Sequence, residues 1–277
     1  MYFLELMKVP RVESKLRVFS FKIQFGSQIS EFRKSLNTVN SACNEVRNSL
    51  KLKEIMKKIL YLGNTLNQGT ARGSAIGFKL DSLLKLTDTR ASTSKMTLMQ
   101  YLCKVLAAKT PALVDFHLEF VSLEAATKIQ LKSLAEEMQA IIKGLEKLKQ
   151  ELVASENDGP VSEVFRKTLK EFISVAETEV VSLTNLYSTV GRNADALALA
   201  LYFGEDPALP DAHLSKFVES DDVLINTVTA TLLNFVRLFR KAHEENVKQA
   251  ELDRKKAEKE AEMEKAKTAN LKKKSAK

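Results

Sequence analysis

Apolar side chains recur at alternating steps of three and four residues over two long stretches of the sequence. This spacing is that of the a and d positions of a coiled coil, because it places the apolar side chains along one face of an α-helix. The first stretch comprises Leu131, Leu134, Met138, Ile141, Leu145, Leu148 and Leu152. The second comprises Leu169, Phe172, Ala176, Val180, Leu183, Tyr187, Val190, Ala194, Leu197 and Leu201. The breaker SENDGP, residues 155–160, lies between them, so the pair predicts a long antiparallel helical hairpin.

Helical spacing also predicts helices before the hairpin. Apolar residues recur at helical intervals over residues 28–66, which indicates one core-facing helix or two in tandem. A further helix is expected through MTLMQYLCKVLAAK, residues 96–109, with Ser92 or Thr93 as its N-cap. Pro111 is expected to open the segment that follows.

The composition favours helices throughout the chain. Nine glycines and five prolines in 277 residues leave few breaks, and the sequence shows no convincing strand pattern. We therefore predict an all-α fold, an elongated helical bundle with the coiled-coil hairpin. A last helix is expected from about Asp222, and its apolar face thins beyond Lys241. This thinning predicts a core domain over residues 1–246 and a charged tail, helical or disordered, over residues 247–277.

No residue pattern predicts catalysis. Cys43 and Cys103 are too few for a disulfide framework and fit a reducing compartment, although one bridge remains open. The histidines His117, His213 and His243 lack metal-ligand spacing. We expect no enzyme, no cofactor and no metal. No apolar run approaches the length of about 18 residues that spans a bilayer, and no signal peptide is recognisable, so we expect a cytosolic protein.

The positive charge is concentrated near the C-terminus. Residues 241–277 contain 12 Lys or Arg and 8 Asp or Glu, a surplus of four within a net charge of +8. Acidic partners are plausible, namely an acidic protein surface, a membrane face or nucleic acid. Nucleic acid is the weakest of these, because no aromatic residues interleave with the lysines. The alternative explanation is a solvated charged helix.

Four of the nine glycines lie in GNTLNQGTARGSAIGFKL, residues 63–80, between two helical flanks. Glycine destabilises helices, so such a cluster marks turns, close backbone approach or a phosphate-binding loop. The phosphate signatures GxGxxG and GxxxxGK[ST] are both missing here. A rigid, shaped surface is the remaining interpretation, and the residues that suggest it are Asn64, Asn67, Arg72, Phe78, Lys79 and Leu80.

The longer stretch GNTLNQGTARGSAIGFKLDSLLKLTDTRA closely resembles the signature of the formin-homology-two domain, the actin-assembling domain of formins. The resemblance includes YFLELMKVPRVESKLRVFSFKIQF and TLLNFVRLFRKAHEEN, and so covers nearly all of residues 2–246. It looks like that of plant-type formins. It implies a dimeric, ring-shaped helical domain that nucleates actin filaments, stays on the growing barbed end, and acts in the cytoplasm at the cytoskeleton. Each subunit of this family has a lasso, a linker, a knob, a coiled-coil region and a post, and the lasso of one subunit encircles the post of the other.

The resemblance also implies roles for single residues. In this reading, Gly63, Asn64, Asn67 and Gly69 line the lasso-binding surface of the post. Phe78 and Leu80 pack behind that surface, mainly as core residues. A lysine of this region contacts actin in the family, and Lys85 is the first choice and Lys79 the second, with a merely solvated lysine as the alternative. The implied partners are actin, a second formin subunit and, through an upstream region, profilin-bound actin.

The sequence departs from the family pattern in two ways. It begins inside the family domain, so we expect the lasso, the linker and the front of the knob to be missing, and actin assembly to be impaired. In addition, residues 209–227, LPDAHLSKFVESDDVLINT, look inserted. The alternative function is that of a helical interaction rod whose basic tail binds a membrane or microtubules.

Overall fold

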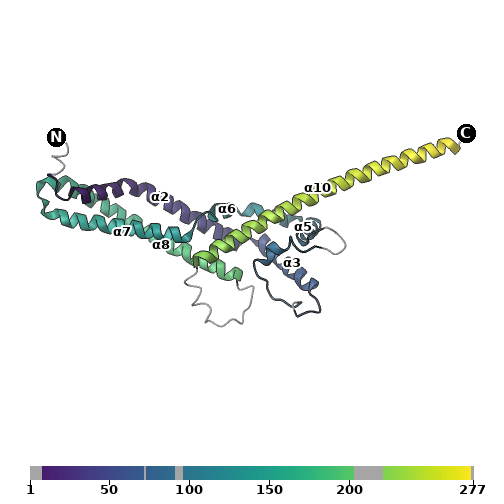
Figure 1. The fold of residues 1–277 in the computed structure, drawn as a ribbon, viewed down its shortest axis with the longest axis horizontal. Helices are drawn as coiled ribbons and strands as arrows, with labels where there is room; N and C mark the ends of the chain where they lie inside the picture. Colours follow the sequence, from purple (N-terminus) through teal and green to yellow (C-terminus); the bar gives the residue numbers. More distant parts are fainter. Residues whose placement is uncertain (1–7, 72, 91–95, 203–220, 276–277) are drawn as a thin grey trace. The chain divides into compact units, whose positions relative to one another are not determined.

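The computed structural model describes residues 8–71, 73–90, 96–202 and 221–275, and most of these residues lie in helices (Figure 1). The expectation of an all-α fold is confirmed, and the described residues form no strand beyond an isolated bridge between Arg90 and Thr97. The α-helices are α2 (Val12–Asn48), α3 (Leu50–Leu66), α4 (Ser82–Lys85), α5 (Leu98–Lys109), α6 (Leu123–Ala126), α7 (Leu131–Ala154), α8 (Glu163–Tyr202) and α10 (Asp221–Ser275). Short 3-10 turns are η1 (Pro111–Leu113), η2 (Phe116–Glu119), η3 (Ser155–Asp158) and η4 (Pro160–Ser162).

The chain divides into two compact units. The first contains α2, α6, α7 and α8, and the second contains α3, α4, α5 and most of α10. The boundary falls between α2 and α3, where Ser49 accepts a hydrogen bond from the backbone N–H of Leu52 at 3.0 Å. This N-cap separates the two helices, so the interpretation as two helices in tandem is confirmed.

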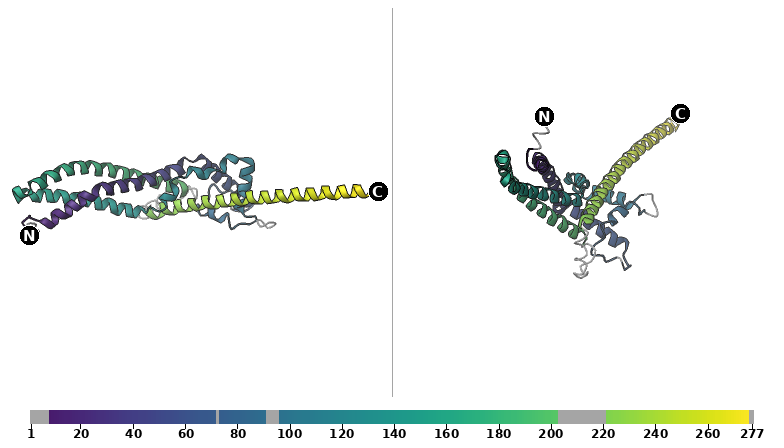
Figure 2. Two further views of the ribbon diagram at one scale, coloured as in Figure 1. Left: turned by 90° about the horizontal axis from the view of Figure 1, so that it is seen from above. Right: turned by 60° about the vertical axis from the view of Figure 1, so that its left-hand side comes forward.

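Helices α2, α7 and α8 run side by side in the first unit (Figures 1 and 2). The ring centroids of Phe19 and Phe165 lie 5.3 Å apart, and those of Phe25 and Phe172 lie 5.2 Å apart. Residue numbers therefore rise in the same direction along α2 and α8, so the two helices are parallel. The helices predicted for the hairpin are present, with the turns η3 and η4 between them. Apolar side chains of α7 and α8 also face α2. The apolar spacing in the sequence does not identify this third helix. The coiled-coil character of the pair stays a prediction.

Helix α7 approaches α2 closely at Gly144. A Cβ atom at this position would overlap the ring of Phe21, so the ring packs directly over the glycine backbone. Gly144 lies in the interior of a 24-residue helix, where glycine costs about 1 kcal/mol relative to alanine. The close contact with the aromatic ring explains why a glycine stands there.

A buried group of charges ties the start of α2 to the turn between α7 and α8. Lys15 Nζ donates to Asp158 Oδ2 and to Ser162 Oγ, each at 2.6 Å. Arg11 donates to Asp158 at 2.7 Å and to Glu151 at 3.1 Å. Lys15 and Glu151 are each only 5% exposed, and a charge so far from water is tolerated only when it is paired. The hydrogen bond from Lys15, followed by those from Arg11 and Ser162, lowers the pKa of Asp158 to about 2.

Aromatic side chains form the core of the second unit. The ring centroid of Phe116 lies 4.9 Å from that of Phe239 and 6.0 Å from that of Phe235. Cys103 of α5 is buried beside them, with its Sγ 3.6 Å from the carbonyl oxygen of Phe239. Beyond Asn246, the side chains of α10 are exposed through residue 265 while the helix continues to Ser275.

The expected N-cap of α5 was wrong. The helix begins after Thr97, whose hydroxyl accepts the N–H of Gln100 at 3.2 Å while the Gln100 side chain accepts the N–H of Thr97 at 2.9 Å. This capping box requires Glu or Gln three residues after the cap, and neither Ser92 nor Thr93 meets that requirement. Both of those residues lie outside the described parts, as does most of the segment 209–227 that looked inserted.

We expect Leu145→Asp to destabilise the first unit by about 3 kcal/mol or more, because it buries a carboxylate without a partner. Leu145 is 7% exposed on α7, whereas Lys147 lies exposed two residues further on. Lys147→Asp is therefore the matched control. Thermal melts followed by circular dichroism would measure both variants, and equal stabilities would contradict the burial of this face.

The charge group predicts a pH dependence of stability. A folded-state pKa of about 2 lies below the unfolded value of about 3.9, so the contribution of Asp158 is present above about pH 4 and is lost as the pH falls towards 2. We expect Asp158→Asn to remove this part of the acid dependence of the free energy of unfolding. Asp81→Asn, at an exposed carboxylate, is the control and should keep the wild-type slope in denaturant titrations between pH 2 and 6. Parallel slopes for the Asp158 variant and the wild type would contradict the assignment.

Candidate functional site

The candidate site is the glycine-rich segment that follows α3 in the second unit (Figure 1). Helix α3 buries Leu52, Ile55 and Ile59 along one face. Leu66 lies seven residues after Ile59 on the same face, yet it is 60% exposed. The apolar stripe of α3 therefore continues past the edge of the core and leaves a large apolar side chain on the surface where the loop begins.

Asn67 ends α3 and forms the first turn of the loop. Its backbone N–H and its side-chain Nδ2 both donate to the carbonyl oxygen of Gly63, at 3.0 and 2.8 Å. Its own carbonyl oxygen accepts the N–H of Thr70 at 3.0 Å. Gly69, within this turn, has a φ of 82°, a conformation that residues with a side chain rarely adopt. Asn67 and Gly69 thus determine the direction in which the chain leaves the helix.

Asn64 fastens the far side of the loop to α3. Its Nδ2 donates to the carbonyl oxygen of Ala75 at 2.8 Å, and its Oδ1 accepts the N–H of Ala75 at 3.0 Å. The amide group therefore satisfies both backbone groups of one loop residue. Asn64 and Asn67 were expected to line a binding surface, and the structure places both amides in hydrogen bonds that hold the loop. A direct contact of either residue with a partner stays a prediction.

Two glycines of the segment differ in the space around them. A Cβ atom at Gly73 would overlap the carbonyl oxygen of Asn67, with the Cα atom of Gln68 only 3.1 Å away. Gly73 therefore permits the two limbs of the loop to approach each other. At Gly63, in contrast, a Cβ atom would have no neighbouring atom within 4 Å, so space within the chain does not require a glycine there.

The chain leaves the loop through α4, a single helical turn. Phe78 and Leu80 are half-buried before it, and Leu83 and Leu86 are buried. Backbone N–H groups of Ser82 and Leu83 donate to the carbonyl oxygens of Lys79 and Leu80 at 2.8 and 3.0 Å, which makes the entry to α4 compact. The segment is therefore anchored in the core of the second unit by its apolar residues.

The two candidate lysines lie at the start and the end of this turn. Lys79 precedes α4 and Lys85 is its last residue, and both are exposed. Exposure at the surface fits a merely solvated Lys85 as well as it fits an actin contact. Actin contact by either lysine stays a prediction. Arg72 lies outside the described residues.

Sequence reasoning missed three exposed apolar side chains in and around the loop. Tyr61, Leu66 and Ile76 are 76%, 60% and 72% exposed, and we call them the exposed loop apolar residues. Tyr61 lies on the face of α3 opposite to Ile55 and Ile59, a position in which the helix core needs no aromatic residue. The sequence position of Tyr61 could therefore have predicted its exposure. The helical pattern alone did not reveal Leu66, because it continues the core stripe.

A buried thiol, the arrangement of possible metal ligands and the helix lengths complete the description of the residues. Burial raises the pKa of the Cys103 thiol to about 12, which leaves it protonated and unreactive. Among the described parts of the chain, no group of three His, Cys, Asp or Glu side chains is arranged to hold a metal ion. None of the described helices is both long and apolar enough to cross a membrane. On the surface, the loop and α4 present exposed apolar side chains at Leu66 and Ile76 and exposed cationic side chains at Lys79 and Lys85.

We expect Gly73→Ala to destabilise the loop by about 1 to 3 kcal/mol, because the added methyl group forces Asn67 and its neighbours apart. Gly63→Ala, at a helical glycine with open space around it, should be neutral or slightly stabilising. Hydrogen exchange at the amides of Asn67, Thr70 and Ala75 measures the opening of the loop. Equal protection in the two variants would show that close approach at Gly73 does not constrain the loop.

The chain is similar to known proteins over nearly its whole length. The family model FH2, described as Formin Homology 2 Domain, matches residues 1–240. Formin-like protein 20 of Arabidopsis thaliana is 74% identical over 273 residues, which cover 99% of this chain and 16% of that protein. Formin-like protein 5 of Oryza sativa subsp. japonica is 66% identical over 266 residues, 96% of this chain and 15% of that protein.

A third relative is closer in length to this chain. Formin-like protein 21b of Arabidopsis thaliana is 67% identical over 267 residues, which cover 96% of this chain and 62% of that protein. The chain therefore spans less than two thirds of each of these relatives. Because the family model covers most of the chain and the identities are this high, the chain belongs to the formin family, with a Formin Homology 2 domain over residues 1–240.

Proposed function

We propose that the chain binds actin and takes part in actin filament assembly, within a domain that nucleates filaments and stays on the growing barbed end. The observation that carries the proposal is the Formin Homology 2 match over residues 1–240, which includes the complete glycine-rich loop. The loop geometry supports it, because a loop held by hydrogen bonds that leaves Leu66 and Ile76 exposed is suited to contact with another protein. We place this activity in the cytoplasm, at the cytoskeleton.

The glycine-rich loop, in this proposal, receives the lasso of a second formin subunit. Gly63, Asn64, Asn67 and Gly69 form the receiving surface, and Phe78 and Leu80 pack behind it. The hydrogen bonds of Asn64 and Asn67 support this role, because a loop that is already ordered loses less conformational entropy when a partner binds. The exposed loop apolar residues supply the area whose removal from water favours binding.

Actin contact is assigned to Lys85 first and to Lys79 second. Both lysines are exposed on the second unit, Lys79 before α4 and Lys85 as its last residue. A lysine there attracts an acidic surface and adds to the rate and specificity of association. Profilin-bound actin is a further partner, delivered through an upstream region of the whole protein.

The test joins a family lasso, linker and knob in front of Tyr2 and compares two variants. Gly63→Trp should lower dimer formation and actin assembly together, because a Cβ atom at Gly63 meets no atom of its own chain within 4 Å and the bulky ring would obstruct an approaching partner. Lys85→Asp should leave the dimer intact and slow assembly. Sedimentation measures the dimer, and the fluorescence of labelled actin measures assembly.

Matched controls are available on other surfaces. Gly26→Trp introduces the same side chain at an exposed helical glycine of the first unit, and Lys104→Asp makes the same charge change on α5. Both controls should behave like the wild type. Normal dimers with Gly63→Trp would reject the receiving role of the loop, and unchanged assembly with Lys85→Asp would reject that lysine as the actin contact.

A second candidate function rests on α10. The helix continues 35 residues past the end of the Formin Homology 2 match, and its side chains are exposed from residue 247 to residue 265. Such a helix suits an interaction rod whose basic end binds a membrane or microtubules. Removal of residues 247–277 should then abolish sedimentation with anionic vesicles or microtubules, and it should leave actin assembly unchanged.

A further inference from the structure

Arg11, the residue before α2, has an unusual backbone conformation. Its φ is 50°, and no other non-glycine residue in the described parts of the chain has a positive φ. A side chain disfavours this left-handed region, because its Cβ atom comes too close to the following carbonyl oxygen. Such a conformation persists only when the contacts around the residue hold it in place. The start of α2 therefore contains a local strain that another interaction must offset.

Three side chains at the end of α7 and in η3 hold the guanidinium group of Arg11. Its Nε donates to Glu151 Oε1 at 3.1 Å, and its Nη2 donates to Asp158 Oδ2 at 2.7 Å and to Ser155 Oγ at 3.3 Å. The side chains of Glu151 and Asp158 are only 5% and 4% exposed, so water competes little for their oxygens. Because a guanidinium group donates in fixed directions, these contacts restrict where the side chain, and with it the Cα atom, can lie.

The backbone on both sides of Arg11 has limited freedom. The carbonyl oxygen of Arg11 accepts the N–H of Lys15 at 3.1 Å, which is the first backbone hydrogen bond of α2. The ring of Pro10 fixes its own φ at about −65° and restricts the backbone of Val9 before it. The φ angle of Arg11 therefore has a large part in the direction from which the chain enters α2.

We propose that Arg11 is a positioning residue: the contacts of its guanidinium group keep its φ positive and so set the direction from which the preceding chain enters α2. The sequence before Lys8 is MYFLELM, in which every residue except Glu5 is apolar or aromatic. A chain that enters in one direction loses less conformational entropy when such side chains pack against another surface. Arg11 belongs to the first unit, and the dimer and actin contacts are assigned to the second, so this role goes beyond the proposed function.

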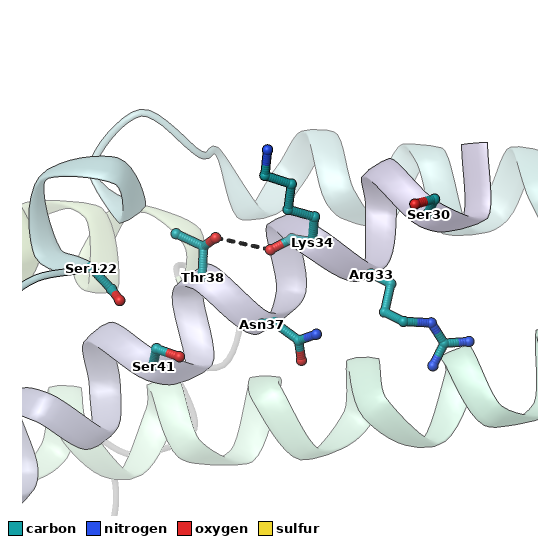
Figure 3. A pocket seen from close by; sticks show the side chains of 7 residues that line it. All are labelled: Ser30, Arg33, Lys34, Asn37, Thr38, Ser41 and Ser122. Atoms are coloured by element: carbon teal, nitrogen blue, oxygen red, sulfur yellow. Dashed lines mark hydrogen bonds between the residues drawn. The ribbon is translucent and has the colours of Figure 1, made fainter. Parts of the chain in front are cut away.

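The experiment measures the distance between two spin labels on the full chain by double electron–electron resonance. The labels are attached at Lys8→Cys, in the entering chain, and at Ser30→Cys, an exposed position on α2 (Figure 3). The stretch of α2 between them is about 27 Å long at 1.5 Å per residue, which the method resolves. The native Cys43 and Cys103 are buried and should remain unlabelled. We expect one narrow distance distribution.

Three substitutions separate the side-chain contacts from the backbone angle. Arg11→Ala should shift the main distance by several ångström, because alanine lacks the guanidinium group and disfavours a positive φ. Arg11→Gly should broaden the distribution around the wild-type distance, because glycine permits a positive φ but nothing holds it there. Arg17→Ala is the control, since the Arg17 side chain on α2 is 79% exposed, and it should keep the wild-type distribution. Circular dichroism melts check that the variants remain folded.

A second label pair, Ser30→Cys with Lys170→Cys on α8, measures whether α2 itself stays in place, and its distance should be equal in all of these proteins. The proposal is overturned if Arg11→Ala keeps the wild-type distribution between positions 8 and 30, or if the wild-type distribution is itself broad. A parallel change between positions 30 and 170 would reject it as well, because Arg11 would then hold α2 and not the entering chain. Identical distributions for Arg11→Ala and Arg11→Gly would reject the role of the φ angle.

Discussion

The first unit depends on the burial of one apolar face of α2. This 37-residue helix contacts α8 through phenylalanine pairs and α7 through the ring of Phe21 over Gly144. Burial of side chains of this size contributes about 1.5 to 3 kcal/mol each, whereas the exposed charges along the helices contribute little. Without α2, the facing stripes of α7 and α8 would each lose part of their cover.

Apolar burial does not by itself determine how far one helix slides along another. The charge group of Arg11, Lys15, Glu151 and Asp158 is directional, because each hydrogen bond has a preferred length and angle. A displacement of α2 by one turn would leave these charges without their partners, which is strongly unfavourable away from water. We therefore regard this group as the feature that sets the register of α2 against the turn between α7 and α8.

In the second unit, hydrogen bonds turn a glycine-rich segment into an ordered surface. The amides of Asn64 and Asn67 bind backbone groups of the loop, and Gly73 lets its two limbs meet. These contacts leave Leu66 and Ile76 exposed in a loop that is held in place. Under the proposed function, this order lowers the conformational entropy that the loop would lose when a partner binds.

The positions of the helices follow from local features of the sequence, because helical periodicity and breakers such as SENDGP act over a few neighbouring residues. The family could also be inferred, since the glycine-rich motif is a continuous stretch. Contacts between distant residues could not be inferred. The pairing of Lys15 with Asp158, the ring of Phe21 over Gly144 and the exposure of Leu66 each depend on segments that meet only in the folded chain. For the same reason, the sequence does not show that the amides of Asn64 and Asn67 hold the loop: the polarity of an amide is visible in the sequence, but its hydrogen-bond partner is decided by the fold.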